Sequence, residues 1–207
     1  MAARKSPSPN PEDVFLNIPF DEGYGRLYLA LIAGLTTIGL TPRSVLEIPP
    51  VQNRLERLIE LIQSCGSSIH DLSRVELSPK KPRCPRFNMP FETGLAVAWA
   101  HAAPVEHRWF LLEAVPFRVQ KSLSDVNGFD PFIHKGTVEG LCSALTKAFY
   151  RPEVTTDQLL KNYRRLRPIA TDLKQRGRFD DLFNGAAFKN LVLAGQKLAV
   201  IDRRVTS

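Results

Sequence analysis

The sequence predicts an α/β fold in which helices cover both faces of a parallel sheet. Two observations carry this prediction. Short apolar runs rich in β-forming residues recur along the first half of the chain, and a stretch with helical periodicity follows each of the first three. Such alternation is typical of parallel strands joined by crossover helices. With 207 residues, 43% hydrophobic and 24% charged, the chain is long enough for one soluble domain with an appendage.

The first part of the chain supplies four strands and three helices. Proline, glycine or polar clusters bound most of the runs, and Gly39 is expected to cap the first helix at its C-terminus. In order, we expect a strand at 13–18, a helix at 27–38, a strand at 42–48, a helix at 51–63, a strand at 67–71, a helix from Met89 or Pro90 to His101, and a strand at 109–115.

Right-handed crossovers between these strands give the order 2-1-3-4, which is a flavodoxin-like (Rossmann-like) sheet of four or five strands. A fifth short strand is expected near 117–121. Three further helices are expected at 137–149, 157–174 and 180–200. The predicted organisation is therefore a disordered tail at 1–12, an α/β domain at 13–150 and a helical C-terminal extension at 151–207.

Composition narrows the function classes. No apolar run approaches the roughly 18–20 residues that cross a bilayer, and the first residues lack the apolar core of a secretory signal. Three widely spaced cysteines favour neither a disulfide framework nor a metal site, so a cytoplasmic protein is expected. The net charge of +7 comes from dispersed basic residues without a nucleic-acid motif, which favours a phosphorylated small molecule over nucleic acid.

Polar residues gather where the third strand ends and the third helix begins. Asp71 and Ser73 follow the strand, and Glu92 lies near the start of the helix. Ligands of open α/β sheets bind beyond the carboxyl ends of the strands, so two acids are expected to meet there. In a first helical turn, Glu92 would be favoured as a carboxylate, which suits a nucleophile or an anion that stabilises a cationic sugar. The alternative is an ordinary first-turn acid.

Each remaining candidate has a structural alternative. Asp71 and Ser73 could hydrogen-bond the hydroxyl groups or the base edge of a ligand, or they could simply stabilise a turn. His70 is more often structural than catalytic. Arginines of the following loop could bind a phosphate group, or could simply be solvated residues of a basic surface loop. Aromatic residues of the first loop could stack on the base of a ligand, or could pack in the protein core. The candidates for substrate binding are Phe20, Asp21, Tyr24, His70, Ser73, Arg74, Arg86 and Asn88, with Asp125 and His134 weaker.

Two stretches carry a resemblance to a known superfamily. Asp71-Leu72-Ser73 ends a buried strand, and the run from Asn88 to Ala96, Asn-Met-Pro-Phe-Glu-Thr-Gly-Leu-Ala, opens a helix. Together they resemble the nucleoside 2-deoxyribosyltransferase superfamily and the nucleotide-binding branch of Toll/interleukin-1 receptor (TIR) domains. The resemblance covers about residues 13–120. The loop at 18–21, the basic loop at 75–86 and the helical tail depart from the family pattern.

The resemblance implies an enzyme that cleaves an N-glycosidic bond of NAD or a related nucleoside or nucleotide. It places the catalytic glutamate at Glu92 and a ligand-binding aspartate at Asp71, with no metal and with NAD or a nucleotide as substrate rather than cofactor. It also implies a homo-oligomer, or a partner protein within an antiphage defence system. The alternative is a non-catalytic module of the same fold that binds a nucleotide signal or a protein.

Overall fold

A five-stranded sheet with all strands parallel forms the centre of the computed structural model, which describes residues 8–49, 53–75, 81, 84–103, 106–176 and 181–206. The strand order is β2-β1-β3-β4-β5, so the predicted order 2-1-3-4 is confirmed. The strands are β1 (Asn10–Asn17), β2 (Thr41–Ser44), β3 (Cys65–Asp71), β4 (Arg108–Glu113) and β5 (Phe132–Ile133).

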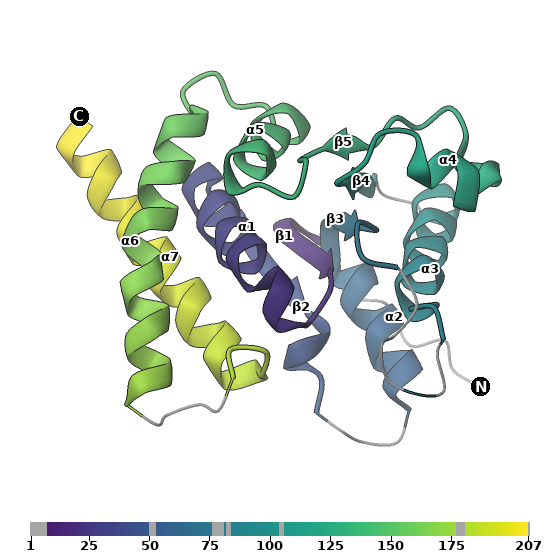
Figure 1. Ribbon diagram of the computed structural model, residues 1–207, viewed down its shortest axis with the longest axis horizontal. Helices are drawn as coiled ribbons and strands as arrows, with labels where there is room; N and C mark the ends of the chain where they lie inside the picture. Colours follow the sequence, from purple (N-terminus) through teal and green to yellow (C-terminus); the bar gives the residue numbers. More distant parts are fainter. Residues whose placement is uncertain are drawn as a thin grey trace.

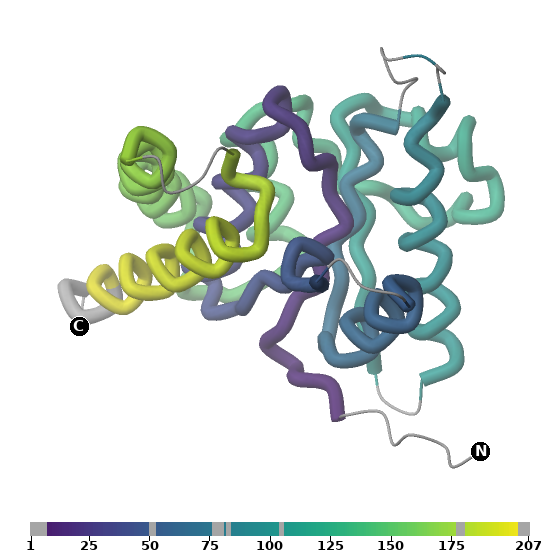
Figure 2. The backbone as a smooth tube through the Cα atoms, turned by 90° about the horizontal axis from the view of Figure 1, so that it is seen from below, coloured from purple at the N-terminus to yellow at the C-terminus, as the bar shows by residue number. Residues whose placement is uncertain are grey.

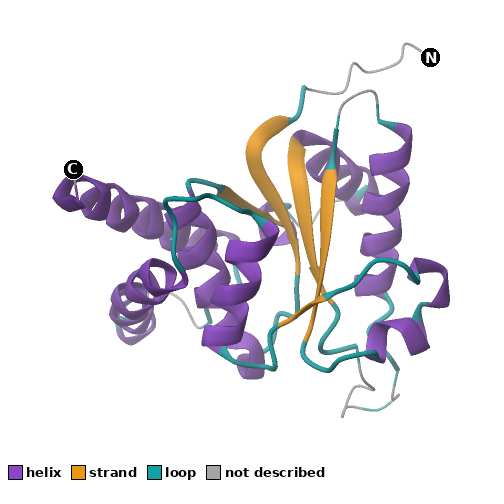
Figure 3. Cartoon of the chain, turned by 90° about the horizontal axis from the view of Figure 1, so that it is seen from above, coloured by secondary structure: helices purple, strands orange, loops and turns teal. Residues whose placement is uncertain are grey.

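Helices cover both faces of this sheet, as Figures 1 and 3 show. One face carries α2 (Arg54–Ser64) and α3 (Asn88–Ala102), and we call it the α3 face. The other carries α1 (Gly25–Ile38) and α5 (Val138–Ala148), and we call it the α1 face. The short α4 (Arg118–Ser122) follows β4. No helix among the described residues is both long and apolar enough to cross a membrane.

The alternation of side chains along a strand decides which face each residue serves. On β1, Val14 and Leu16 join the large cluster around α1, whereas Phe15 joins the cluster around α2. On β3, Ile69 points to the α1 face, and its neighbour His70 points to the α3 face. Since Asp71 is two residues after Ile69, it shares the α1 face.

The C-terminal helices are part of the domain core. Both α6 (Thr156–Gln175) and α7 (Gly185–Thr206) pack against α1, and Figure 2 shows them as an outer layer beyond it. Eleven of the fourteen residues of α1 are buried, because the sheet lies on one side and these helices on the other. The apolar residues of the expected extension, Leu182, Phe188 and Leu191, belong to the same cluster as α1.

Several boundaries differ from the predictions. β1 begins at Asn10, so residues 10–12 of the expected disordered tail are strand, while residues 1–7 lie outside the described residues. β2 ends at Ser44, where Ser44 and Glu47 form a capping box over a short 3-10 turn.

The expected fifth strand near 117–121 is wrong, because α4 occupies this segment and the fifth strand is Phe132–Ile133. Glu113 turns the chain at the end of β4: its carboxylate accepts hydrogen bonds from the N–H groups of Ala114 and Val115. The same carboxylate binds Arg118 with two hydrogen bonds, from Nε at 3.0 Å and Nη2 at 2.5 Å.

Candidate functional site

The predicted site residues lie at the carboxyl edge of the sheet, but they fall into three separate groups. Asp71 and Tyr24 lie on the α1 face, and His70 lies on the α3 face with Glu92. Asp21, Arg74 and Arg86 form a partly exposed cluster. The three groups differ in burial and in hydrogen bonding, and those differences decide what chemistry each group can do.

Asp71 is fully buried, and both of its carboxylate oxygens accept hydrogen bonds. The Tyr24 hydroxyl donates to Oδ2, and the N–H of Ser73 donates to Oδ1 at 2.9 Å. His134 Nε2 lies 3.2 Å from Oδ2. Burial by itself raises the pKa of Asp71, but the hydrogen bonds from His134, Tyr24 and Ser73 bring it below its ordinary value. Asp71 is therefore a buried carboxylate that three protein donors hold in place.

The partners of Asp71 are held as donors. The N–H of Gly136 donates to His134 Nδ1 at 3.0 Å, so the ring proton is on Nε2 and points at Asp71. Burial, with the adjacent Asp71 carboxylate, raises the pKa of Tyr24 well above its ordinary value, so its hydroxyl stays protonated. This network joins the loops after β1, β3 and β5, and its role is to fix the carboxyl edge of the sheet.

A second network follows β3 on the α3 face. Asn17 Nδ2 lies 3.0 Å from His70 Nδ1, and His70 Nε2 lies 2.9 Å from the Ser68 hydroxyl. The Ser68 hydroxyl in turn lies 3.0 Å from His107 Nε2, and His107 Nδ1 lies 3.0 Å from the carbonyl oxygen of Cys65. The carbonyl requires a proton on His107 Nδ1, which sets the direction of every other hydrogen bond in the series.

Both histidines of this network are neutral and structural. Burial lowers the pKa of His70 to about 3, and the neighbouring His107 contributes in the same direction. Burial also lowers the pKa of His107. Asn17 additionally donates to the carbonyl of Met89 at 2.7 Å, which ties β1 to the start of α3. His70 therefore positions α3 and does not reach a ligand.

Glu92 differs from all of these groups. It is the fifth residue of α3, because the helix begins at Asn88, and it lies beyond the first turn in which it was expected. Its side chain is buried, with 9% of the residue exposed, and among the described residues no group donates a hydrogen bond to it. Burial raises the pKa of Glu92 to about 7, although the positive charge of Arg54 at the start of α2 partly opposes this.

The expectation that the helix dipole favours the ionised form of Glu92 is wrong, because burial dominates and raises the pKa of this group rather than lowering it. A carboxyl group with a pKa near 7 exists in both protonation states at neutral pH. Such a group can act as a base, an acid or a nucleophile, and perturbed acids of this kind are enriched at functional sites.

The basic residues of the third group are paired with one acid. Asp21 Oδ2 lies 2.8 Å from Arg86 Nη1 and 3.3 Å from Arg74 Nε. The Arg74 guanidinium also lies against Gly23, where a side chain would collide with it. Both arginine side chains remain about one third exposed, at 40% for Arg74 and 32% for Arg86, so they can still meet an anion.

The other predicted binding residues have structural positions. Phe20 packs edge to face against Phe183, with ring centroids 6.0 Å apart. Ser73 is buried, and its carbonyl accepts a hydrogen bond from Arg118. Asn88 is exposed and does not cap α3, because the N-cap position is Phe87.

The structure does not bring the two predicted catalytic acids together. Asp71 faces Tyr24 and His134 on the α1 face, whereas Glu92 lies in α3 on the other side of the sheet. The expectation that they share one hollow fails because Asp71 is sealed by protein donors. Among the described residues, no group of three or more histidine, cysteine or acidic side chains is placed to hold a metal ion.

Sequence reasoning missed the two networks. His134 was a weaker candidate, and Asn17, Ser68 and His107 were not candidates at all. A signal was present for some of them, since Ser68 and His70 are two residues apart and so share one face of β3. Their partners come from β1 and from the loop before β4, which no local pattern reveals.

Comparisons with known proteins found no match to a family model, a curated protein or a solved structure.

Proposed function

We propose that this protein cleaves the N-glycosidic bond of NAD or a related nucleoside or nucleotide, with Glu92 as the reacting carboxyl group. The observation that carries the proposal is the state of Glu92: buried, without a hydrogen-bond donor among the described residues, and with its pKa raised to about 7. A carboxylate that is only partly hydrated is stabilised when positive charge develops beside it. Cleavage at a sugar C1 creates such a charge.

The ionised form of Glu92 suits two closely related routes. As a nucleophile, the carboxylate bonds to C1 while the C1–N bond breaks and the base departs with the electron pair; water then hydrolyses the glycosyl ester. As a stabiliser, it balances the charge on the sugar while water adds. Arg74 and Arg86, at the same edge of the sheet and partly exposed, are suited to the phosphates of a nucleotide.

The test is release of free base from NAD and from a panel of nucleosides and nucleotides, followed by chromatography. Wild type is compared with Glu92→Gln, which keeps the size of the side chain and removes its charge. Glu56→Gln, an exposed acid in the first turn of α2, is the matched control. We expect release by wild type and Glu56→Gln and none by Glu92→Gln. Equal release by Glu92→Gln would refute the role of Glu92.

The second candidate function is a non-catalytic module that binds a nucleotide signal. It is favoured by the three protein donors that already bind the Asp71 carboxylate, and by the fact that Glu92 lines none of the three cavities whose walls consist of described residues. Binding of NAD or a nucleotide without any release of base, in the same panel, would identify this function.

We further propose that the active form is a homo-oligomer or a complex with a partner protein. Its support is an exposed apolar row on α7, where Leu193, Val200 and Ile201 are each about half exposed at positions seven and eight apart. Analytical ultracentrifugation of wild type and Leu193→Glu tests it, because the charged variant should shift the protein to a smaller species. A role in antiphage defence rests on the sequence resemblance and is tested by phage plating.

A further inference from the structure

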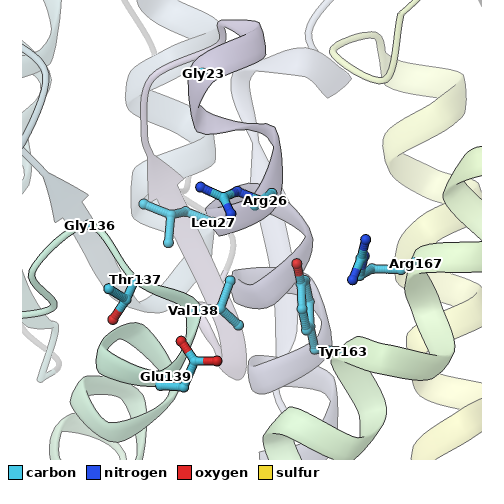
Figure 4. A pocket seen from close by; sticks show the side chains of 9 residues that line it. All are labelled: Gly23, Arg26, Leu27, Gly136, Thr137, Val138, Glu139, Tyr163 and Arg167. Atoms are coloured by element: carbon cyan, nitrogen blue, oxygen red, sulfur yellow. The ribbon is translucent and has the colours of Figure 1, made fainter.

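A cavity of about 320 Å³ lies on the α1 face, away from Glu92. Its walls come from the start of α1, from the loop between β5 and α5, and from the middle of α6 (Figure 4). The lining side chains include Arg26 of α1, Arg167 and Tyr163 of α6, and Glu139 of α5. Residues far apart in the sequence thus converge on one hollow that the proposed N-glycosidase chemistry does not use.

The cavity carries an excess of positive charge. Arg26 and Arg167 are both exposed, and within the described part of the chain neither has a carboxylate partner. The Arg167 guanidinium lies 5.9 Å from the centre of the Tyr163 ring, which holds it beside the cavity. Two arginines from different helices, opposed by one carboxylate, favour an anionic ligand with planar or tetrahedral oxygens.

Tyr163 points to the same conclusion independently. Most of this residue is buried, with 6% of it exposed, and its hydroxyl has no hydrogen-bond partner among the described residues but is not itself sealed from the cavity. Figure 4 shows this hydroxyl directed into the cavity, toward the space between the two arginines. The hydroxyl is therefore open to the cavity, where it can donate a hydrogen bond to a ligand oxygen or accept one from a ligand.

The wall opposite α6 suits the remainder of a ligand. The end of the loop before α5 and the first two residues of this helix, together Gly136 to Glu139, border the cavity, so the positive end of the helix dipole lies beside it. Glu139 is exposed there and can accept hydrogen bonds from hydroxyl groups. Leu27 and Val138 add apolar surface between the polar groups.

We propose that this cavity binds a small phosphorylated sugar. The phosphate binds Arg26, Arg167 and the Tyr163 hydroxyl, and the sugar hydroxyls donate to Glu139. The site does not depend on the function proposed for Glu92, because the two lie on opposite faces of the sheet. A ligand here would bridge α1, α5 and α6 and so stabilise the contact between the sheet domain and the C-terminal helices.

Isothermal titration calorimetry with ribose 5-phosphate, with ribose as the uncharged control, tests the proposal at low salt. We expect wild type to bind ribose 5-phosphate and not ribose. Arg26→Gln and Arg167→Gln should each lose about tenfold in affinity, because each removes a charge-assisted hydrogen bond. Tyr163→Phe should lose a smaller, several-fold amount. Arg164→Gln, an exposed arginine of α6 that does not line the cavity, is the matched control and should bind as wild type does.

Two outcomes overturn the proposal: no binding of ribose 5-phosphate by wild type, or unchanged binding by the Arg26→Gln, Arg167→Gln double variant with a wild-type circular dichroism spectrum. The same titration with Glu92→Gln separates the two proposals. Binding by that variant should equal that of wild type whether or not it has lost the release of base.

Discussion

Two buried acids, Asp71 and Glu92, lie at the same edge of one sheet and have opposite environments. Asp71 receives hydrogen bonds from Tyr24, Ser73 and His134, and its pKa is held below the ordinary value. Glu92 receives none from the described residues, and its pKa rises to about 7. Asp71 is the more deeply buried of the two, at 0% exposed against 9%, and yet its pKa is the lower one, so the donors that each carboxyl meets decide the difference.

The two environments suit different roles, one structural and one chemical. A carboxylate that accepts hydrogen bonds from three fixed protein donors contributes stability and has little left to offer a ligand. A buried carboxyl without donors costs stability when it ionises, and proteins retain such groups mainly where a reaction uses them. By this criterion Asp71 belongs to the framework, and Glu92 is the better candidate for chemistry.

The largest effect is expected from removing Asp71. Asp71→Ala leaves the Tyr24 hydroxyl and the His134 N–H buried without an acceptor, so we expect a loss of about 3–5 kcal/mol in the free energy of unfolding. Asp71→Asn keeps one acceptor oxygen and should lose less. Urea denaturation followed by circular dichroism measures both. A stable Asp71→Ala protein that has lost nucleotide binding would instead show that Asp71 binds the ligand, and would contradict its structural role.

An effect of opposite sign is expected at Glu92. Because its folded pKa is about 7 and its ordinary value 4.5, the folded state binds more protons between these values, and wild type loses stability as the pH rises through this window. Glu92→Gln has no such group to ionise. Its stability should match that of wild type below about pH 4 and exceed it by roughly 1–3 kcal/mol at pH 9. Denaturation at the two pH values checks this, with Glu56→Gln as the control that should show no such gain.

If base release depends on the Glu92 carboxylate, the wild-type rate should also rise as the pH passes through about 7. A rate that falls over the same range would make the protonated form the active one. Glu92 would then donate its proton to the leaving base instead of attacking or stabilising the sugar.

The smallest effect is expected in the partly exposed cluster. Arg86→Gln removes one of the two cations beside Asp21, and the other, Arg74, remains. Ion pairs at this degree of exposure contribute little, so the free energy of unfolding should change by less than about 1 kcal/mol. Thermal unfolding measures the change. A much larger loss in the free energy of unfolding would show that this cluster, like the Asp71 network, has a structural role.

The fold was predictable because it depends on patterns local in the sequence. The apolar runs that became β1, β3 and β4 and the helical periods between them are each readable within about ten residues, and crossover handedness supplied the strand order. The misplaced fifth strand shows the limit. Residues 117–121 follow an apolar strand, but the chain forms α4 from Arg118 onward, with Arg118 bound back to Glu113 at the end of β4.

The candidate site was less predictable. The position of Asp71 at a strand end was correct, but its side chain faces the α1 side because of strand parity, and its donors come from η1 (Glu22–Tyr24) and from His134, far along the chain. The environment of Glu92 depends on where α3 begins. The sequence predicted a start at Met89 or Pro90, but the helix begins at Asn88, so Glu92 lies past the first turn.

The enclosure of α1 has a consequence for how the chain assembles. The sheet contacts one side of this helix, and α6 and α7 contact the other. Residues 8–150 alone would therefore expose to water a large apolar surface that α6 and α7 cover in the whole chain. Separate polypeptides ending and beginning near Pro152 should therefore associate when mixed. Such a pair of fragments could serve as a reporter, because the folded complex forms only when both fragments are present.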